Sequence, residues 1–137
     1  MEYQKLIDYR NGIPGFTKEM GMVVTAVAEG YAQVEMELDA RSHNPIGSTH
    51  GGVIFAIADT AGGVAATSRG SCVTTVEGSI NYLNAAMQGT KKLIAATREL
   101  KAGKNILVYD VTVSDETGRV IAEARMSYFS LHKPLEL

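Results

Sequence analysis

The sequence predicts an α+β fold in which an antiparallel sheet curls around one buried helix. Three observations support this prediction: a hairpin pattern near the N-terminus, one helical segment that is apolar on almost every face, and about four strand-like runs after it. The 137 residues fit one domain of ordinary size, and a hydrophobic content of 45% can supply its core without disulfides or a structural metal. We therefore expect a single domain over residues 1–137.

Residues 1–19 are expected to form a short helix and a loop. Four side chains recur there at helical spacing, and the Asn-Gly and Pro-Gly pairs that follow stop a helix: Tyr3, Leu6, Ile7 and Arg10. Residues 20–37 alternate apolar and polar side chains around a Glu-Gly turn, which predicts a hairpin. The polar segment 41–52, interrupted by Pro45 and three glycines, predicts a loop.

The segment 53–66 is apolar all around and rich in small residues, so it predicts a helix that must be buried. Four strand-like runs separated by turn residues follow it, and they can pair as antiparallel neighbours: 73–83, 93–100, 106–113 and 120–131.

The overall composition narrows the possible partners. A formal charge of −2 and a pI near 5.9 provide no basic field for nucleic acid or anionic membrane. The lone Cys72 cannot form an intrachain disulfide, and the N-terminal residues lack a signal-peptide pattern, so a cytoplasmic location is expected. No apolar run approaches the length of a membrane span.

Asp59 is the only charged residue between Gly52 and Thr67, in the middle of the predicted buried helix. Burying an unpaired carboxylate is costly. Such a residue is therefore either a hydrogen-bonded structural group or a general base or nucleophile that faces a cleft. Its position in the helix does not favour one interpretation over the other.

The loop of residues 44–52 ends where this helix begins. Helix starts carry free N–H groups and partial positive charge, and Gly51 and Gly52 leave those groups uncovered, so both can hold a ligand oxygen or a developing oxyanion. Two glycines also make ordinary tight turns, but the neighbouring His50 and Asn44 favour the ligand interpretation.

Gly51 and Asp59 are eight positions apart, about 12 Å along one helix. Both cannot touch one reacting carbonyl within a chain. If both are functional, a two-fold homodimer with composite interface sites is expected.

The sequence gives less support to metal-dependent, serine-esterase and nucleotide-binding chemistry. The three histidines include no pair at helical metal-ligand spacing, and Cys72 has no second cysteine, so no metal site is expected. No Gly-x-Ser-x-Gly elbow, dinucleotide-binding glycine motif or phosphate-cradling loop is present.

The motif Asn44-Pro-x-Gly-x-x-His50-Gly51-Gly52, with Asp59 and Ala61 at their spacings, resembles that of hotdog-fold acyl-CoA thioesterases of the phenylacetate-pathway type. The resemblance covers nearly the whole chain. It implies a long helix wrapped by a six-stranded antiparallel sheet, in homodimers that often pair into homotetramers. It also implies hydrolysis of an aryl- or acyl-CoA to free acid and CoA, without a cofactor because coenzyme A is part of the substrate.

The same resemblance implies the site residues. The Gly51 N–H would polarise the thioester carbonyl, with His50 and Asn44 shaping that position, while Asp59 of the partner chain activates water or attacks directly. Thr75 would position the water. Further residues are expected to bind the substrate and its coenzyme A: Gly52, Tyr82, Leu83, Asn84, Lys101, Gly103, Lys104 and Asn105.

Two other functions on the same fold stay open at this stage. One is an acyl-CoA binding or sensing protein without turnover, which has no need of a buried carboxylate beside a hydroxyl. The other is an enoyl-CoA hydratase, which calls for an aspartate and a histidine in a loop before the helix. The acyl or aryl group, the role of Asp59 as base or nucleophile, and the choice between dimer and tetramer are not determined by the sequence.

Overall fold

The segment predicted as a buried helix forms α3 (Gly51–Thr67), around which the rest of the chain is arranged. Most of its apolar side chains are buried: Val53, Ile54, Ile57, Ala58, Ala61, Val64, Ala65 and Ala66. The computed structural model describes all 137 residues. Three shorter helical elements precede α3, namely α1 (Tyr3–Gly12), α2 (Phe16–Glu19) and the 3-10 turn η1 (Ala40–Ser42).

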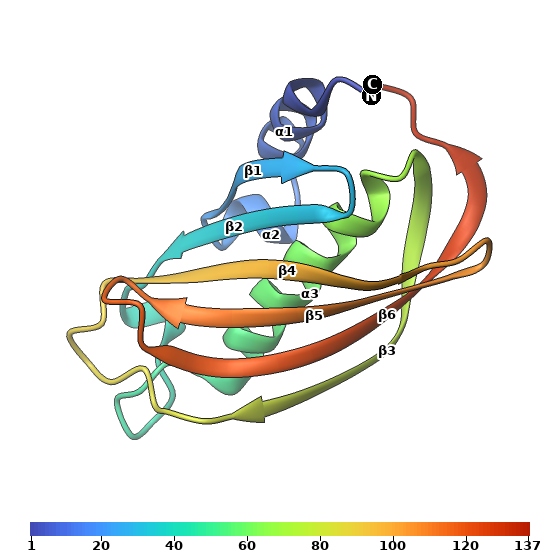
Figure 1. Cartoon of the computed structure of the whole chain (residues 1–137). Helices are drawn as coiled ribbons and strands as arrows, with labels where there is room; N and C mark the ends of the chain where they lie inside the picture. The colour runs from blue at the N-terminus through green and yellow to red at the C-terminus, as the bar shows by residue number, and fades with distance from the viewer.

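Six antiparallel strands form one sheet in the order β1-β2-β4-β5-β6-β3. Their bounds are β1 (Met22–Ala28), β2 (Tyr31–Glu37), β3 (Ser71–Tyr82), β4 (Lys92–Ala102), β5 (Ile106–Asp115) and β6 (Val120–Pro134). Figure 1 shows the sheet curving around α3, which it covers with one face. The predicted fold, a long helix wrapped by a six-stranded antiparallel sheet, is confirmed.

The structure corrects several predicted boundaries. Helix α3 begins at Gly51 rather than at residue 53, because the His50 side chain caps it and allows two more residues to join. Strand β6 continues to Pro134, beyond residue 131, since Ser71 of β3 still pairs with it there. The sequence does not predict helix α2 or the turn η1, because segments of four and three residues carry too little periodicity.

Helix α1 is held against β1 at two points. Leu6 is fully buried in the core. Near the helix end, the Asn11 side chain accepts a hydrogen bond from Val24 N–H at 2.8 Å and donates to Val24 O at 3.0 Å. This anchor fixes the last turn of α1, including Arg10, beside the start of α2.

Strand β3 is one of the two edges of the sheet. Most of its residues from Thr74 to Tyr82 are exposed, and these include the apolar side chain of Val76, which is 54% exposed. A long uncovered edge with apolar side chains is a surface that proteins usually cover. No helix of the structure has the length and apolar character required to cross a membrane.

Candidate active site

Asp59 lies half-buried in the middle of α3, facing β3 and β6. Its Oδ1 accepts a hydrogen bond from Thr75 Oγ1 at 2.8 Å and a longer one from Tyr128 Oη at 3.2 Å. No protein donor binds Oδ2. With one oxygen held by two hydroxyls, the carboxylate is fixed in orientation and its second oxygen can act on a water or a ligand.

Tyr128 is a residue of this site that the sequence did not reveal. Its hydroxyl donates chiefly to the Asp59 backbone oxygen, at 2.8 Å. Burial, together with the negative charge of Asp59, raises the pKa of Tyr128, so the hydroxyl stays protonated and remains a donor. A signal was available, because Tyr128 continues the inward row of Ala124 and Met126 on β6 and a buried tyrosine hydroxyl needs a partner.

Gly62 makes room for Tyr128 against α3. A Cβ at position 62 would overlap the Tyr128 hydroxyl, whereas one at Gly63 would meet the same ring at 3.7 Å, an ordinary contact. We expect Gly62→Ala to displace Tyr128 and to lower the free energy of unfolding by about 1–3 kcal/mol, as over-packing does. Gly63→Ala is the matched control and should be neutral or stabilising by up to about 1 kcal/mol, because alanine favours helix over glycine. Urea denaturation measures both, and equal stabilities would contradict the expectation.

The start of α3 offers one free N–H rather than two. His50 Nδ1 accepts a hydrogen bond from Gly52 N–H at 2.8 Å, so this amide is already used. The first residue of a helix has no intrahelical acceptor, and no loop hydrogen bond uses the Gly51 N–H. The expectation that Gly52 also donates to the ligand is therefore corrected: with this cap in place, Gly51 is the available donor.

Asn44 holds the loop that leads to His50. Its Oδ1 accepts from the N–H groups of Ile46 and Ser48, both at 3.1 Å, and its amide donates to Ser48 Oγ at 2.8 Å. The side chain thus closes the 44–48 turn. Within one protomer, Asn44 therefore acts on the start of α3 only indirectly, by fixing the shape of the loop that precedes it.

The proposed catalytic groups form two separate pairs in a protomer. Thr75 contacts Asp59, and at the other end of β3 the Tyr82 hydroxyl donates to Gly51 O at 2.8 Å. Helix α3 and strand β3 run in opposite directions, so the two pairs are separated by eight residues of α3, about 12 Å along its axis. One protomer does not bring Gly51 and Asp59 together.

The residues expected to bind coenzyme A also lie in two places. Tyr82 pairs with Ala122 near the start of β6, whereas the backbone oxygen of Asn105 accepts a hydrogen bond from Ser130 N–H near its end. The turn with Lys101, Gly103 and Lys104 is therefore at the opposite end of the sheet from Tyr82, Leu83 and Asn84 (Figure 1).

Besides Tyr82, whose hydroxyl donates to Gly51 O, two more of these side chains already have partners within the fold. The Asn84 amide donates to Val120 O at 2.8 Å, and its oxygen accepts from Arg119 at 3.0 Å. Asn105 Oδ1 lies 2.8 Å from His132 Nε2. Asn84 and Asn105 therefore organise their loops. The exposed side chains of Leu83, Lys101 and Lys104, and the exposed ring of Tyr82, are left to meet a ligand.

Asp59 opens into a cavity of about 280 Å³. Its walls come from α1, α2, α3, β3 and β6, and mix apolar with hydroxyl and charged side chains, among them Arg10, Phe16, Thr60, Val73, Thr75 and Tyr128. This volume is near the lower end of small-molecule sites. A cavity of this size has room for a water or a small part of a ligand beside the Asp59 carboxylate. No three His, Cys, Asp or Glu side chains of the protein are grouped so as to hold a metal ion.

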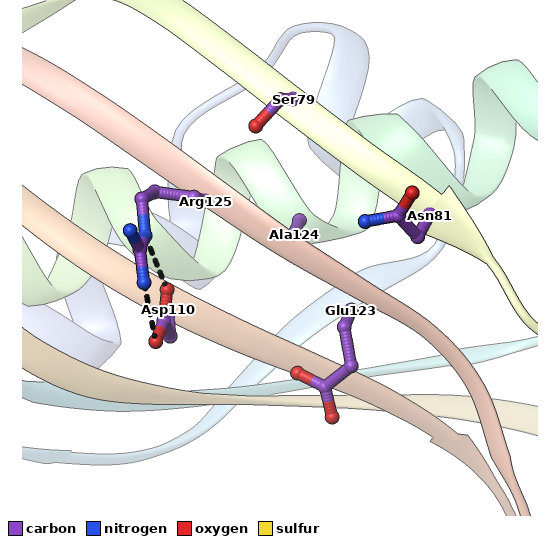
Figure 2. Close-up of a pocket in the computed structure, with 6 residues that line it drawn as sticks. All are labelled: Ser79, Asn81, Asp110, Glu123, Ala124 and Arg125. Carbon is purple, nitrogen blue, oxygen red and sulfur yellow. Dashed lines mark hydrogen bonds and ion pairs between the residues drawn. The ribbon is translucent and has the colours of Figure 1, made fainter.

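A second hollow, of about 350 Å³, lies on the outer face of the sheet, on the side away from α3 (Figure 2). Its charged groups have partners within the sheet: Arg125 Nε donates to Asp110 at 2.9 Å in an ion pair, and Glu123 accepts a hydrogen bond from the Thr112 hydroxyl at 2.8 Å. Figure 2 shows Ser79 and Asn81 of β3 on the same face. Because both oxygens of each acid already accept hydrogen bonds, none is left free to act on a ligand, and this hollow is a weaker candidate for catalysis.

Residues 46–122, which include Gly51, Asp59 and Thr75, match the family model of the Thioesterase superfamily. The proofreading thioesterase EntH of Klebsiella pneumoniae is 32% identical over 110 residues, which cover 78% of this chain and 79% of that protein.

Two solved structures extend the similarity to nearly the whole chain. The PaaI protein of the Escherichia coli phenylacetic acid degradation operon superposes with a TM-score of 0.89 at 25% identity, covering 98% of this chain and 96% of PaaI. A Streptococcus mutans protein bound to acetyl CoA superposes with a TM-score of 0.81 at 29% identity, covering 90% and 97% of the two chains.

Proposed function

The chain belongs to the thioesterase superfamily and is a thioester hydrolase, and from this premise we propose that it hydrolyses an aryl- or acyl-CoA with Asp59 as the catalytic carboxylate. The observation that carries the proposal is the cavity in which Thr75 holds one Asp59 oxygen and leaves the other free. The acetyl CoA bound to the Streptococcus mutans relative supports coenzyme A as the thiol part of the substrate.

In the proposed reaction the Gly51 N–H polarises the thioester carbonyl. Asp59 removes a proton from a water that attacks the carbonyl carbon, or attacks that carbon itself and forms an anhydride that water then hydrolyses. The oxyanion of the tetrahedral intermediate is stabilised by the Gly51 N–H. The C–S bond then breaks and coenzyme A leaves as a thiolate, which needs no strong general acid because thiols have a pKa of about 8.5.

The proposed active unit is a homodimer joined along β3. Antiparallel pairing of this edge with the partner's β3, centred on Gly78 and Ser79, sets Thr75 opposite the partner's Tyr82. Because Thr75 contacts Asp59 and Tyr82 contacts Gly51, the same pairing brings Asp59 toward the partner's Gly51. It also covers the exposed strand edge.

The antiparallel pairing of the two β3 strands has a two-fold axis, and this axis also brings together the residues expected to bind coenzyme A. It brings the Tyr82 end of one sheet toward the Lys101 and Lys104 turn of the other, although these lie at opposite ends of one protomer. Two lysine ammonium groups near exposed backbone suit the phosphates of coenzyme A. A pairing of two such dimers into a tetramer stays a prediction.

Thiol release from a panel of aryl-, short-, medium- and long-chain acyl-CoAs, followed with a thiol-reactive chromophore, tests the proposed function. Hydrolysis of at least one ester with release of free acid is expected. Tight binding of the esters without release would favour the sensing protein. A change in enoyl absorbance without free thiol would favour the hydratase.

A further inference from the structure

Arg10 is the one arginine of this chain whose guanidinium has no partner in the protomer. Each of the other five donates to a carboxylate or amide oxygen: Arg41 to Asp39, Arg69 to Glu99, Arg98 and Arg125 to Asp110, and Arg119 to Asn84. Arg10 instead lines the cavity that contains Asp59. An unpaired cation in a candidate active site indicates a group that the ligand supplies.

The position of Arg10 is fixed by the fold. The adjacent Asn11 makes two hydrogen bonds to the Val24 backbone, and Leu6, one turn earlier, is fully buried. Arg10 itself is partly buried, and this burial lowers the pKa of its guanidinium, although an arginine stays charged in proteins. A partly desolvated charge without a partner is costly, so an anion that enters the cavity is favoured there.

No side chain of the cavity forms an ion pair with Arg10, and the negative charge of Asp59 acts on it only from a longer distance. None of its nitrogens lies within the 4.0 Å ion-pair distance of Asp59, whose Oδ1 is already held by Thr75. The hydroxyls of Thr60 and Thr67 donate to backbone oxygens of α3, so they cannot act as partners of equal strength. The cavity therefore has a carboxylate for chemistry on one wall and an unpaired cation on another.

We propose that Arg10 is a specificity residue that binds a carboxylate at the far end of the acyl group, so that the preferred substrates are CoA thioesters of dicarboxylic acids. The planar fork of a guanidinium matches a carboxylate with two parallel hydrogen bonds. Without that contact, Asp59 in the same cavity repels an anionic acyl group. The inference rests on the proposed function, because it assigns this cavity to the acyl part of the substrate.

The test compares esters of equal chain length that end in a carboxylate or a methyl group: succinyl- and butyryl-CoA, glutaryl- and pentanoyl-CoA, and adipoyl- and hexanoyl-CoA. For at least one length, kcat/KM of the wild type should favour the carboxylate by about 10- to 100-fold, the range of a hydrogen bond to a charged group. Arg10→Met should bring that ratio to one or below, because Asp59 then repels the carboxylate, while it spares the methyl-ended ester. Arg10→Lys should retain part of the preference. Lys5→Met, an exposed cation on the same helix, is the matched control and should leave the ratio unchanged.

Calorimetric binding of the same esters to Asp59→Asn separates this inference from the proposed function. If carboxylate-ended esters bind more tightly in an Arg10-dependent way, but the wild type releases no thiol from any ester, the proposed hydrolysis is overturned and the inference about Arg10 stands. An equal ratio in the wild type and Arg10→Met at every chain length, in binding and in turnover, would overturn the inference. So would a change confined to dimer dissociation, which would make Arg10 an interface contact.

Discussion

Replacing Asp59 by asparagine is expected to lower kcat by about 10²- to 10⁴-fold, the range that a positioned general base contributes. The asparagine oxygen can still accept the hydrogen bonds of Thr75 and Tyr128, because it occupies the place of Oδ1. What is lost is the free anionic Oδ2 toward the cavity. The loss therefore falls on the chemical step, whether Asp59 acts as base or as nucleophile.

Thiol release by purified Asp59→Asn, beside the wild type, measures this loss. Asp8→Asn is the matched control, since it makes the same change at an exposed carboxylate on α1 that only accepts from Gln4. Unfolding midpoints of both variants should stay close to that of the wild type. Near-normal turnover in Asp59→Asn would remove this residue from the mechanism.

Much of the fold follows from patterns that are local in sequence. Helix α3 could be predicted because residues 53–66 are apolar on almost every face, which indicates a buried helix. The strands could be predicted because their side chains alternate, as in β5, where every second residue from Leu107 to Asp115 is buried. These signals depend on neighbouring residues alone.

The arrangement of the site depends on an irregularity that the sequence does not reveal. Thr75 and Tyr82 are seven residues apart, so strict alternation would place them on opposite faces of β3. The register with β6 shifts between Thr75 and Glu77, and this bulge turns both Thr75 and Tyr82 toward α3. Without the bulge, the hydroxyl of Thr75 could not reach Asp59.

Arg10 shows a second limit of sequence reasoning. Its spacing with Leu6 predicted a helix, but nothing in the spacing indicated that this helix packs on β1 with Arg10 facing Asp59. The cavity thus brings together residues about fifty positions apart in the chain. Long-range packing of this kind is determined by the tertiary fold, beyond the reach of local periodicity.

Replacing Gly51 by proline should lower kcat by about 10²- to 10³-fold, as the loss of one oxyanion donor does. Proline removes the N–H but suits the first position of a helix, and His50 before it already has an extended ψ of 133°. Gly51→Ala is the matched control, because it adds the same Cβ, 3.2 Å from the Tyr82 ring, and keeps the N–H. Equal activity of the two variants would contradict a role for this amide.

The two substitutions together test whether the site is shared between chains. In a heterodimer of one Gly51→Pro chain and one Asp59→Asn chain, composite sites place both substitutions in one site and leave the other intact. Such a heterodimer, purified through two different tags, should therefore recover about half of the wild-type activity. Sites built within a single chain would leave each site with one substitution, and the heterodimer would stay as inactive as its parents. Recovery would establish that Asp59 acts on a carbonyl held by the partner's Gly51.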